Sequence, residues 1–473
     1  VSAGPVGQQA VTANSGTTTI DLSSGNVIYM TQSANTTVAF ANTEGNTDVV
    51  YLIRIKDDNT TTRTLTWPSG FVWNGGTEPT LLQKSGGVAL KGQTFKLTTR
   101  DNGATWYGVE VVNYDTKVPY ELWSMGWNSS GIMGTNAPGS RWSSPVQVPG
   151  TTWASIESHG ANAGAHMVQT KSDSTLWAWG YNDKGQLGQN NGTTYSSPIQ
   201  IPGTTWAESS SNGSMTLATK TDGTLYMWGN NSSGGLGQND RTQRSSPVQI
   251  GSGTDWGISE GHISVADSNR AAAIKNDGTL WTWGLNEYGQ LGQNNKTYYS
   301  SPIQIPGTTW SKIDLGYHSG AGLKTDGTLW SWGMNNNGML GQNQPGNSRY
   351  SSPVQVPGTT WKHITFSYYD LLATKTDGTL WAWGSNAYGQ LGQNNLIPVS
   401  SPVQIPGTTW SIVGGAGAAT KTDGTLWTWG ENAPGKLGHN NRIHRSSPTQ
   451  VPGTSWADVK VHNKVIFANK SLS

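Results

Sequence analysis

The sequence predicts an all-β protein, in which an N-terminal β-sandwich precedes a seven-bladed β-propeller. Three observations lead to this prediction. Glycine is frequent, at 62 of 473 residues, and Ser, Thr and Asn are common, as in proteins made of short strands and tight turns. No long stretch shows the apolar period of an amphipathic helix. A short segment of the form Leu-Trp-x-Trp-Gly, as in Leu426–Gly430, recurs along most of the chain.

Residues 1–114 lack this repeat and have the pattern of short strands. Apolar and polar residues alternate over 50–55, and Gly-, Asn-, Thr- and Pro-rich stretches separate the segments. Asn102-Gly103 is a strong hairpin signal, because both residues tolerate the positive φ of a tight primed turn; it predicts that 95–99 pairs with 105–112. The pattern as a whole predicts a β-sandwich, with further strands at residues 17–22, 27–31, 36–40, 48–56, 63–67 and 88–91.

Parts of this region resemble a module of bacteriophage fibre proteins and other virion appendage proteins. The resemblance lies in residues 25–30 (Gly-Asn-Val-Ile-Tyr-Met), 36–40 (Thr-Thr-Val-Ala-Phe), 65–68 with 72–76, and 101–108 (Asp-Asn-Gly-Ala-Thr-Trp-Tyr-Gly). It implies that residues 1–114 serve attachment and oligomerisation within a fibre, as a homotrimer.

Residues 115–120 are predicted to form a linker, because Asp115, Lys117 and Pro119 interrupt the strand pattern. The repeats then occupy 121–473. Each unit has a Pro-Gly-Thr-Thr-Trp lead-in, a strand that ends in Lys before an Asp-Gly turn, the tryptophan strand, and Asn-x-x-Gly-x-Leu-Gly followed by Ser-Ser-Pro. Four short strands per unit, at a period of about fifty residues, are typical of a β-propeller. Seven copies of the tryptophan strand begin at Leu122, Leu176, Leu225, Leu280, Leu329, Leu380 and Leu426.

The two ends of the array carry complementary halves of one unit. The last unit has its lead-in at Trp456 and a strand over 465–470, but no tryptophan strand follows it. The first unit begins directly with the tryptophan strand at Leu122. We therefore expect the N- and C-terminal strands of the propeller to pair in one blade and close the ring, which removes open sheet edges.

The repeat closely resembles that of the regulator-of-chromosome-condensation propeller family. The resemblance covers 121–473 and rests on Lys-x-Asp-Gly-Thr-Leu-Trp-x-Trp-Gly and Asn-x-x-Gly-Gln-Leu-Gly. The family includes nucleotide exchange factors, light sensors and inhibitor proteins, so the resemblance implies a fold and not one activity. The 473 residues include no basic tail of the kind expected of a chromatin-bound exchange factor. The repeat departs from the pattern at Met125 and at Tyr226-Met227.

The composition argues against several function classes. With no cysteine, the chain can have no disulfide, thiolate metal site or cysteine nucleophile. The formal net charge of +1 does not suggest a nucleic-acid partner, and no apolar stretch reaches the length of a membrane span. The eight histidines are scattered, and no phosphate-binding loop or nucleophile elbow occurs. We therefore predict no catalytic residue, metal site or cofactor, and read 19 of the 24 tryptophans as packing residues of the repeat.

The best candidate for a binding site is the place where the repeats differ. The loop between Leu-Gly and Ser-Ser-Pro varies from unit to unit, and the residue just before Ser-Ser-Pro is usually aromatic or arginine. Tyr, Trp and Arg are favoured at recognition hot spots, although such a side chain could also simply cover the neighbouring blade. If the blades are equivalent, these positions form a ring on one rim, which we call the candidate ring: Trp142, Tyr195, Arg244, Tyr299, Tyr350 and Arg445, with Val399 in the remaining unit.

The expected function is that of a non-enzymatic virion structural protein, such as a bacteriophage tail fibre. Its propeller would bind a glycan or protein on the host surface, and its other partners would be further copies of the chain and other fibre or tail proteins. The expected location is the virion, outside the cell. Two alternatives stay open: a secreted or surface-exposed bacterial propeller that binds a protein, and a nucleotide exchange factor.

Overall fold

The computed structural model describes different amounts of the two parts of the chain. In the first 118 residues it describes nine strands, and from Pro119 to Ser471 it describes all residues except 155, 157–165, 267–268, 345, 347, 416 and 463. The chain divides into two compact units, Val1–Val118 and Pro119–Leu472. This division falls within the stretch 115–120 that the sequence predicts as a linker.

The strands of the first unit form two sheets, which differ in their strand pairing. The first has the order β1-β3-β5-β8-β9-β7 and the second the order β2-β4-β6. Successive strands of the second sheet run parallel, whereas β8 pairs antiparallel with β9, as the hairpin signal predicts. The predicted turn at Asn102-Gly103 and the strand predicted at 88–91 lie outside the described residues, and the β-sandwich stays a prediction. The bounds are β1 (Gln8–Ala13), β2 (Gly16–Asp21), β3 (Val27–Gln32), β4 (Thr36–Ala41), β5 (Val49–Asp57), β6 (Leu65–Thr66), β7 (Phe71–Trp73), β8 (Gln93–Thr99) and β9 (Trp106–Val111).

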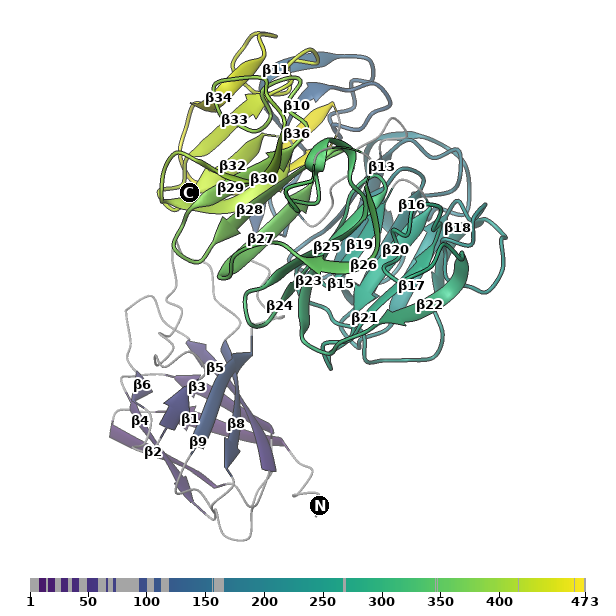
Figure 1. Cartoon of the computed structure of the whole chain (residues 1–473). Coiled ribbons are helices and arrows are strands. Elements are labelled where there is room, and N and C mark those ends of the chain that lie inside the picture. Colours follow the sequence, from purple (N-terminus) through teal and green to yellow (C-terminus); the bar gives the residue numbers. More distant parts are fainter. Residues whose placement is uncertain are drawn as a thin grey trace. The chain divides into compact units, whose positions relative to one another are not determined.

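The second unit is a seven-bladed β-propeller, as predicted, and each blade is a separate antiparallel sheet (Figure 1). Blade 1 contains the two ends of the propeller sequence, and blade 2 is the one with three described strands. Blade 1 consists of β35 (Trp456–His462), β36 (Val465–Ser471), β10 (Tyr120–Trp127) and β11 (Arg141–Gln147). Blade 2 consists of β12 (His166–Thr170), β13 (Leu176–Gly180) and β14 (Tyr195–Ile201). Trp153 bridges β10 and Lys171 beside them.

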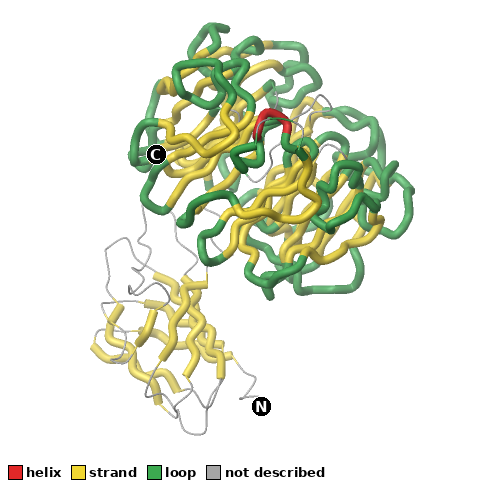
Figure 2. The backbone as a smooth tube through the Cα atoms, in the orientation of Figure 1, coloured by secondary structure: helices red, strands yellow, loops and turns green. Residues whose placement is uncertain are grey.

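Blades 3 to 7 each contain four strands in chain order. Blades 3 and 4 are β15 (Trp206–Asn212), β16 (Met215–Lys220), β17 (Leu225–Gly229), β18 (Arg244–Gln249), and β19 (Ile263–Ala266), β20 (Arg270–Ile274), β21 (Leu280–Gly284), β22 (Tyr299–Ile305). Blade 5 is β23 (Trp310–Leu315), β24 (Ser319–Lys324), β25 (Leu329–Met334) and β26 (Arg349–Gln355), with the 3-10 helix η2 (Asn336–Gly338) in its last loop (Figure 2). Blades 6 and 7 are β27 (Trp361–Phe366), β28 (Asp370–Lys375), β29 (Leu380–Gly384), β30 (Val399–Ile405), and β31 (Trp410–Gly415), β32 (Ala418–Lys421), β33 (Leu426–Gly430), β34 (Arg445–Gln450).

In blades 3 to 7 the repeated hairpin is built by its Asp-Gly turn, as the sequence predicts. In blade 7 the Asp423 carboxylate accepts hydrogen bonds from the Thr425 backbone N–H (3.0 Å) and hydroxyl (2.6 Å). The Thr425 hydroxyl in turn accepts one from Trp427 Nε1 at 2.9 Å. Gly424 has φ +77°, which an L side chain rarely adopts. The turn therefore also fixes the first tryptophan of the strand that follows.

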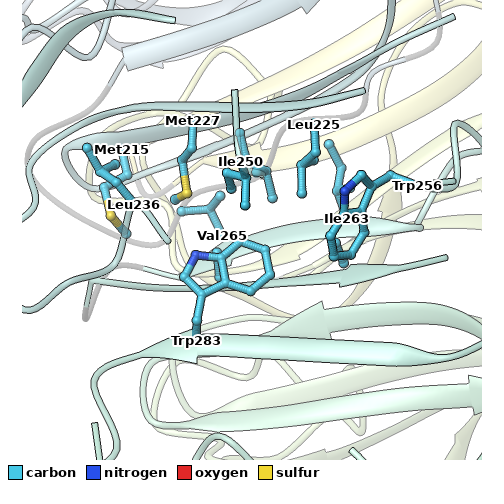
Figure 3. Close-up of a cluster of buried hydrophobic side chains, with 12 residues drawn as sticks. Met215, Leu225, Met227, Leu236, Ile250, Trp256, Ile263, Val265 and Trp283 are labelled. Atoms are coloured by element: carbon cyan, nitrogen blue, oxygen red, sulfur yellow. The ribbon is translucent and has the colours of Figure 1, made fainter. Parts of the chain in front are cut away.

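Seven buried hydrophobic clusters lie among the described propeller residues, one between each pair of neighbouring blades. Figure 3 shows the cluster between blades 3 and 4, where Trp283 of β21 points toward Ile250, Met227 and Val265. The corresponding tryptophans of the other repeats, such as Trp332, are equally buried. These side chains are packing residues, as predicted, because blade contact removes large aromatic areas from water.

A ring of seven equivalent hydrogen bonds joins the blades near their outer strands. In each loop an asparagine with φ of 54–56° donates its backbone N–H to a serine carbonyl at the start of the next blade's last strand. Asparagine suits this position because its side chain tolerates the left-handed region. The pairs are Asn136–Ser196, Asn190–Ser245, Asn239–Ser300, Asn294–Ser351, Asn343–Ser400, Asn394–Ser446 and Asn440–Ser143.

Blade 1 contains strands from both ends of the propeller sequence. β10 pairs antiparallel with β36, in a register that runs from Tyr120 opposite Ser471 to Gly126 opposite Val465. β35 pairs with β36 on its other side. Met125, which replaces a tryptophan in this blade, is buried against Ile466 and Leu437 in the cluster between blades 7 and 1. The smaller side chain is therefore accommodated without leaving the core.

Candidate functional site

The propeller has two faces of different character. Strands alternate in direction within each blade, so connections between first and second strands and between third and fourth strands lie at the same end. We call this end the loop face, and the opposite end, with the Asp-Gly turns, the turn face. The first strands of neighbouring blades contact one another around the axis, as β15 does with β19 and β23 with β27.

The candidate ring lies at equivalent positions on the loop face. Each member stands at or next to the beginning of a fourth strand and pairs with the glycine that ends the tryptophan strand, as Tyr299 pairs with Gly284. The same register holds at Gly126–Trp142, Gly180–Tyr195, Gly229–Arg244, Gly333–Tyr350, Gly384–Val399 and Gly430–Arg445. These are the outermost strands, so the positions are spread around the circumference.

Several candidate-ring side chains hold their own loops. Arg244 forms an ion pair with Asp240 at 2.7 Å, and the Tyr299 hydroxyl accepts a hydrogen bond from Asn295 at 3.0 Å. Trp142 is 40% exposed; the others are half-buried: Tyr195, Arg244, Tyr299, Tyr350 and Arg445. Among the described residues no contact joins two members of the ring, so the six side chains do not converge on one point.

The loops that carry these residues are pinned by a buried asparagine. In blade 4, Asn286 Oδ1 accepts a hydrogen bond from the Leu291 N–H (2.9 Å), and its Nδ2 donates to the carbonyls of Asn295 and Thr297. The asparagine of each Asn-x-x-Gly-x-Leu-Gly motif occupies the same place: Asn128, Asn182, Asn231, Asn335, Asn386 and Asn432. The loop face is therefore a rigid platform on which individual side chains can vary.

One part of the loop face carries a connected group of aromatic rings, which we call the aromatic ladder: Tyr288, Tyr317, His318, Tyr368 and Tyr369, with Arg349 at one end. The Tyr317 ring stacks on Tyr368 (centroids 4.5 Å apart, planes at 20°) and lies 4.0 Å from His318. His318 lies 4.6 Å from Tyr288, over which the Arg349 guanidinium sits at 4.7 Å. The rings are half-buried and Arg349 is exposed.

A buried arginine holds the turn that bears Tyr317 and His318. The fully buried Arg270 of β20 donates hydrogen bonds to three carbonyl oxygens of this turn, those of Gly316, Tyr317 (2.9 Å) and Ser319 (2.8 Å). The fourth carbonyl, that of His318, accepts from the Met334 N–H at 2.9 Å. With every carbonyl of the turn engaged, the two ring-bearing residues have little backbone freedom.

The electrostatics of the aromatic ladder favour neutral rings. Burial, followed by the charge of Arg270, lowers the pKa of His318 to about 4, so its imidazole is uncharged at pH 7. Burial raises the pKa of Tyr369, and Tyr317 adds to the shift, so its phenol keeps its proton. Beside them the carboxyl of Asp370 is fully buried, and burial raises its pKa to about 7.

The central channel carries most of the charged side chains of the inner strands. A cavity of about 40 Å³, with room for about two or three waters, is lined by Lys312 and Asp314 of β23 and by Glu208, Glu260, His363 and Lys460 from other blades. Carboxylates here accept backbone N–H groups of the next blade, as Asp314 does from Phe366 (2.6 Å) and Glu208 from Gly261 (2.7 Å). The channel acids therefore join blades, and the cavity is too small for a sugar or nucleotide.

A larger cavity, of about 360 Å³, lies where the repeat departs from its pattern in blade 3. It is lined by Tyr226, Trp206 and Lys220, together with the loop residues Gln189 and Asn190. The Lys220 ammonium lies 4.6 Å from the Tyr226 ring and 5.2 Å from Trp206. The same lysine-between-aromatics arrangement recurs in every blade, for example at Lys421, so these contacts belong to the scaffold.

Sequence reasoning did not identify the aromatic ladder as a site, although a signal for it existed. The segment 317–320 differs between repeats, and a difference of this kind is a signal for a rim or for the channel mouth. Tyr368-Tyr369 stands at the equivalent turn of blade 6, and only the fold brings the two turns together. Among the described residues no group of three or more His, Asp or Glu is placed to hold a metal ion, and no helix is long and apolar enough to cross a membrane.

Comparison with known proteins identifies the repeats. A family model described as the regulator of chromosome condensation (RCC1) repeat matches more than half of the chain, at residues 173–216, 222–258, 277–321, 326–368, 377–415 and 423–467. A second model of the same repeat matches 310–338.

Several solved structures share the fold. Human WBSCR16 is 18% identical, with a TM-score of 0.63 over 74% of this chain and 99% of that chain. Prp20p from Saccharomyces cerevisiae is 18% identical, with a TM-score of 0.66 over 76% of this chain and 94% of that chain. Yeast RCC1 (Prp20) bound to Kap60 is 19% identical, with a TM-score of 0.65 over 76% and 92%. At these identities the likeness shows the fold alone.

Proposed function

This chain belongs to the family of proteins built from RCC1 repeats, and from that premise we propose that it is a binding protein, without enzymatic activity, that recognises its partner with the loop face of the propeller. One observation carries the proposal. The loop face holds half-exposed aromatic and arginine side chains that differ between blades, on loops pinned by buried asparagines such as Asn286. Rigid loops that carry such residues are the usual setting of recognition surfaces.

The setting we propose for this binding is a virion appendage, such as a bacteriophage tail fibre, with the chain as a homotrimer. The support is the resemblance of residues 25–108 to fibre modules. The propeller would then be displayed outside the particle and bind a host-surface glycan or protein. Antibodies raised against the propeller should label purified particles in electron micrographs, and the full chain should sediment as a trimer. Labelling of bacterial cell surfaces in place of particles would favour the secreted or surface-exposed alternative.

The candidate ring gives a first test of the binding role. Alanine substitutions at Trp142, Tyr299 and Tyr350 are expected to weaken adsorption to host cells. In the Trp142→Ala variant the unfolding temperature of the propeller should stay nearly unchanged, because Trp142 is exposed. Unchanged adsorption in all three variants would remove the ring from the binding surface.

We also propose that the pairing of β10 with β36 closes the ring and stabilises the whole propeller. The continuous register from Tyr120–Ser471 to Gly126–Val465 supports this. So does the burial of Phe467 between blades 1 and 2, where its ring contacts Trp179.

A second candidate function is nucleotide exchange on a small GTPase. It is favoured by the shared fold with Prp20p, whose structure was described together with its binding to Gsp1p and histones. An exchange factor would accelerate nucleotide release from a GTPase loaded with a fluorescent nucleotide. No acceleration across a panel of GTPases from the source organism would exclude this function.

A further inference from the structure

We propose that the aromatic ladder is a glycan-binding site, in which the solvent-exposed parts of the half-buried Tyr317, Tyr368 and Tyr288 rings pack against sugar rings. This inference rests on the proposed binding function and gives it a site and a class of partner. In addition to the candidate ring, whose members do not converge, it assigns to the loop face a continuous row of rings that runs across blades 4, 5 and 6.

The ladder is not needed to build the turns that bear it. The equivalent turn of blade 3 consists of Asn212, Gly213 and Ser214, and that of blade 7 contains Gly415 and Gly417. Small residues therefore suffice for the fold at this position. In blades 5 and 6 the turns carry Tyr317-His318 and Tyr368-Tyr369, which leaves large, half-exposed rings on the loop face.

The chemistry of the ladder fits a polyhydroxylated chain. The apolar C–H face of a pyranose ring packs against the exposed parts of aromatic rings, and phenol hydroxyls can hydrogen-bond to its hydroxyl groups. The row contains no carboxylate, and its histidine is neutral at pH 7. Its one cation is the exposed Arg349, 4.7 Å from the Tyr288 ring, so the row suits neutral sugars and also sugars with a carboxylate.

The site is held in place before a ligand arrives. Arg270 engages three of the four carbonyls of the 316–319 turn. In blade 6 the Ser367 N–H donates to the Asp370 carbonyl at 2.9 Å and the Ser385 N–H donates to the Tyr369 carbonyl at 2.9 Å. Binding therefore orders few additional groups, and preorganisation of this kind favours affinity for a flexible chain such as a glycan.

The test measures binding of the full chain to an array of neutral and acidic bacterial cell-surface polysaccharides. Tyr317→Ala and Tyr368→Ala are expected to weaken binding by about tenfold each, which equals about 1.4 kcal/mol and is near the upper end of what one aromatic contact contributes. The matched control is Tyr388→Ala. Tyr388 occupies in blade 6 the loop position that Tyr288 has in blade 4, but its ring lies 5.3 Å from that of His444, outside the ladder, so its loss should leave binding unchanged.

A second measurement uses the unaltered protein, in case the alanine variants fold poorly. Tyrosine nitration by tetranitromethane, read by mass spectrometry, should be slowed at Tyr317 and Tyr368 when a bound polysaccharide from the array is present, and unchanged at Tyr388. Equal nitration with and without the polysaccharide would overturn the ladder as the site.

The outcomes separate this inference from the function on which it rests. Retained polysaccharide binding in folded Tyr317→Ala and Tyr368→Ala variants would refute the ladder and leave the binding function standing. Adsorption to host cells that is abolished by treating the cells with protease, with no polysaccharide bound, would show that the partner is a protein and refute the glycan. Failure of the unaltered chain to bind either cells or polysaccharides would refute both proposals.

Discussion

Ser174 occupies a backbone position that is glycine in the other repeated turns. Its φ is +64°, whereas Gly223, Gly278, Gly327, Gly378 and Gly424 have φ of 77–79° at the same place. An L side chain in this region costs roughly 1–2 kcal/mol. Part of this cost is offset because serine loses less backbone freedom than glycine when the chain folds. Ser174 therefore fits the backbone conformation of its turn less well than glycine does in blades 3 to 7.

Replacing Ser174 by glycine and Gly278 by serine should shift the stability of the propeller in opposite directions. Ser174→Gly is expected to raise the unfolding temperature slightly, because relief of backbone strain outweighs the entropy of the new glycine. Gly278→Ser should lower the free energy of unfolding by about 2 kcal/mol, since a Cβ there would lie 2.2 Å from the Thr308 carbonyl oxygen. Thermal unfolding followed by circular dichroism measures both. Equal and small effects would show that the turns tolerate side chains more freely than their φ values indicate.

Asp370 gives the propeller a stability that depends on pH. Burial raises its pKa from 3.8 to about 7, against the opposing effects of Gln390, Ser367 and Lys436. The folded state therefore binds the proton more tightly than the unfolded state. The stabilising contribution is fully present below about pH 4 and is lost as the pH rises through about 7.

Replacing Asp370 should remove this part of the pH dependence. Between pH 4 and pH 7 the free energy of unfolding should fall in both proteins. We expect the fall in Asp370→Asn to be smaller than that in the unaltered protein by a few kcal/mol. Denaturant unfolding at both pH values measures the difference. The exposed Asp377, which caps a turn and whose pKa is lowered by its hydrogen bonds to Thr379, provides the control Asp377→Asn. An equal fall of the free energy of unfolding in Asp370→Asn and in the unaltered protein would contradict the raised pKa of Asp370.

At the scale of the blade, one buried asparagine determines the shape of each variable loop. The Asn286 side chain forms hydrogen bonds with the Leu291 N–H and with two loop carbonyls, and it is itself inaccessible to water. The motif thereby separates two roles. The asparagine and the glycines maintain the loop, and the residues between them are free to differ between blades. This is why the loop face can carry a binding surface without loss of the repeat.

Asn286→Ala should destabilise the propeller by about 2–4 kcal/mol, because it leaves buried backbone groups without partners. The exposed Asn276, in the turn of the same blade, gives the matched control Asn276→Ala, for which a change within about 0.5 kcal/mol is expected. Urea unfolding measures both. A loss at Asn286 no greater than at Asn276 would mean that the loop is held by other contacts.

At the scale of the whole molecule, interfaces of one kind join the blades of the propeller. Seven hydrophobic clusters and seven Asn–Ser hydrogen bonds join the blades, including the bond from Asn440 in blade 7 to Ser143 in blade 1. Blade 1 differs from the others in that its four strands come from the two ends of the propeller sequence.

Deleting residues 465–473 tests the proposed closure. The deletion removes β36 and takes Val465 and Phe467 out of the cluster between blades 1 and 2. It also leaves β10 and β35 with unpaired edges, so we expect loss of cooperative thermal unfolding and a tendency to aggregate. Deletion of residues 472–473 alone, which lie after β36, is the control. Unchanged unfolding after the longer deletion would show that ring closure does not depend on β36.

The repeat made the scaffold predictable. Trp429, Asp423 and Asn432 each recur at a fixed spacing, and their local partners are fixed by short stretches of chain, so blade number and strand order follow from the pattern. The sequence also placed the candidate ring at equivalent positions, as Tyr299 opposite Gly284 illustrates. What Tyr299 contacts could not be predicted, because a strand-end aromatic can either face solvent or brace its own loop, as the bond to Asn295 shows it does.

The sequence by itself therefore determined the number of blades, the turns that build them and the residues that pack them, because these depend on contacts within one repeat or between like repeats. Only the tertiary structure decided which unrepeated residues become neighbours. Tyr317 and Tyr368 are 51 positions apart and meet because blades 5 and 6 lie side by side. Arg270 reaches their turn from blade 4. The closeness of such groups depends on how successive blades rotate about the common axis, and no spacing within a repeat encodes that relation for residues that occur only once.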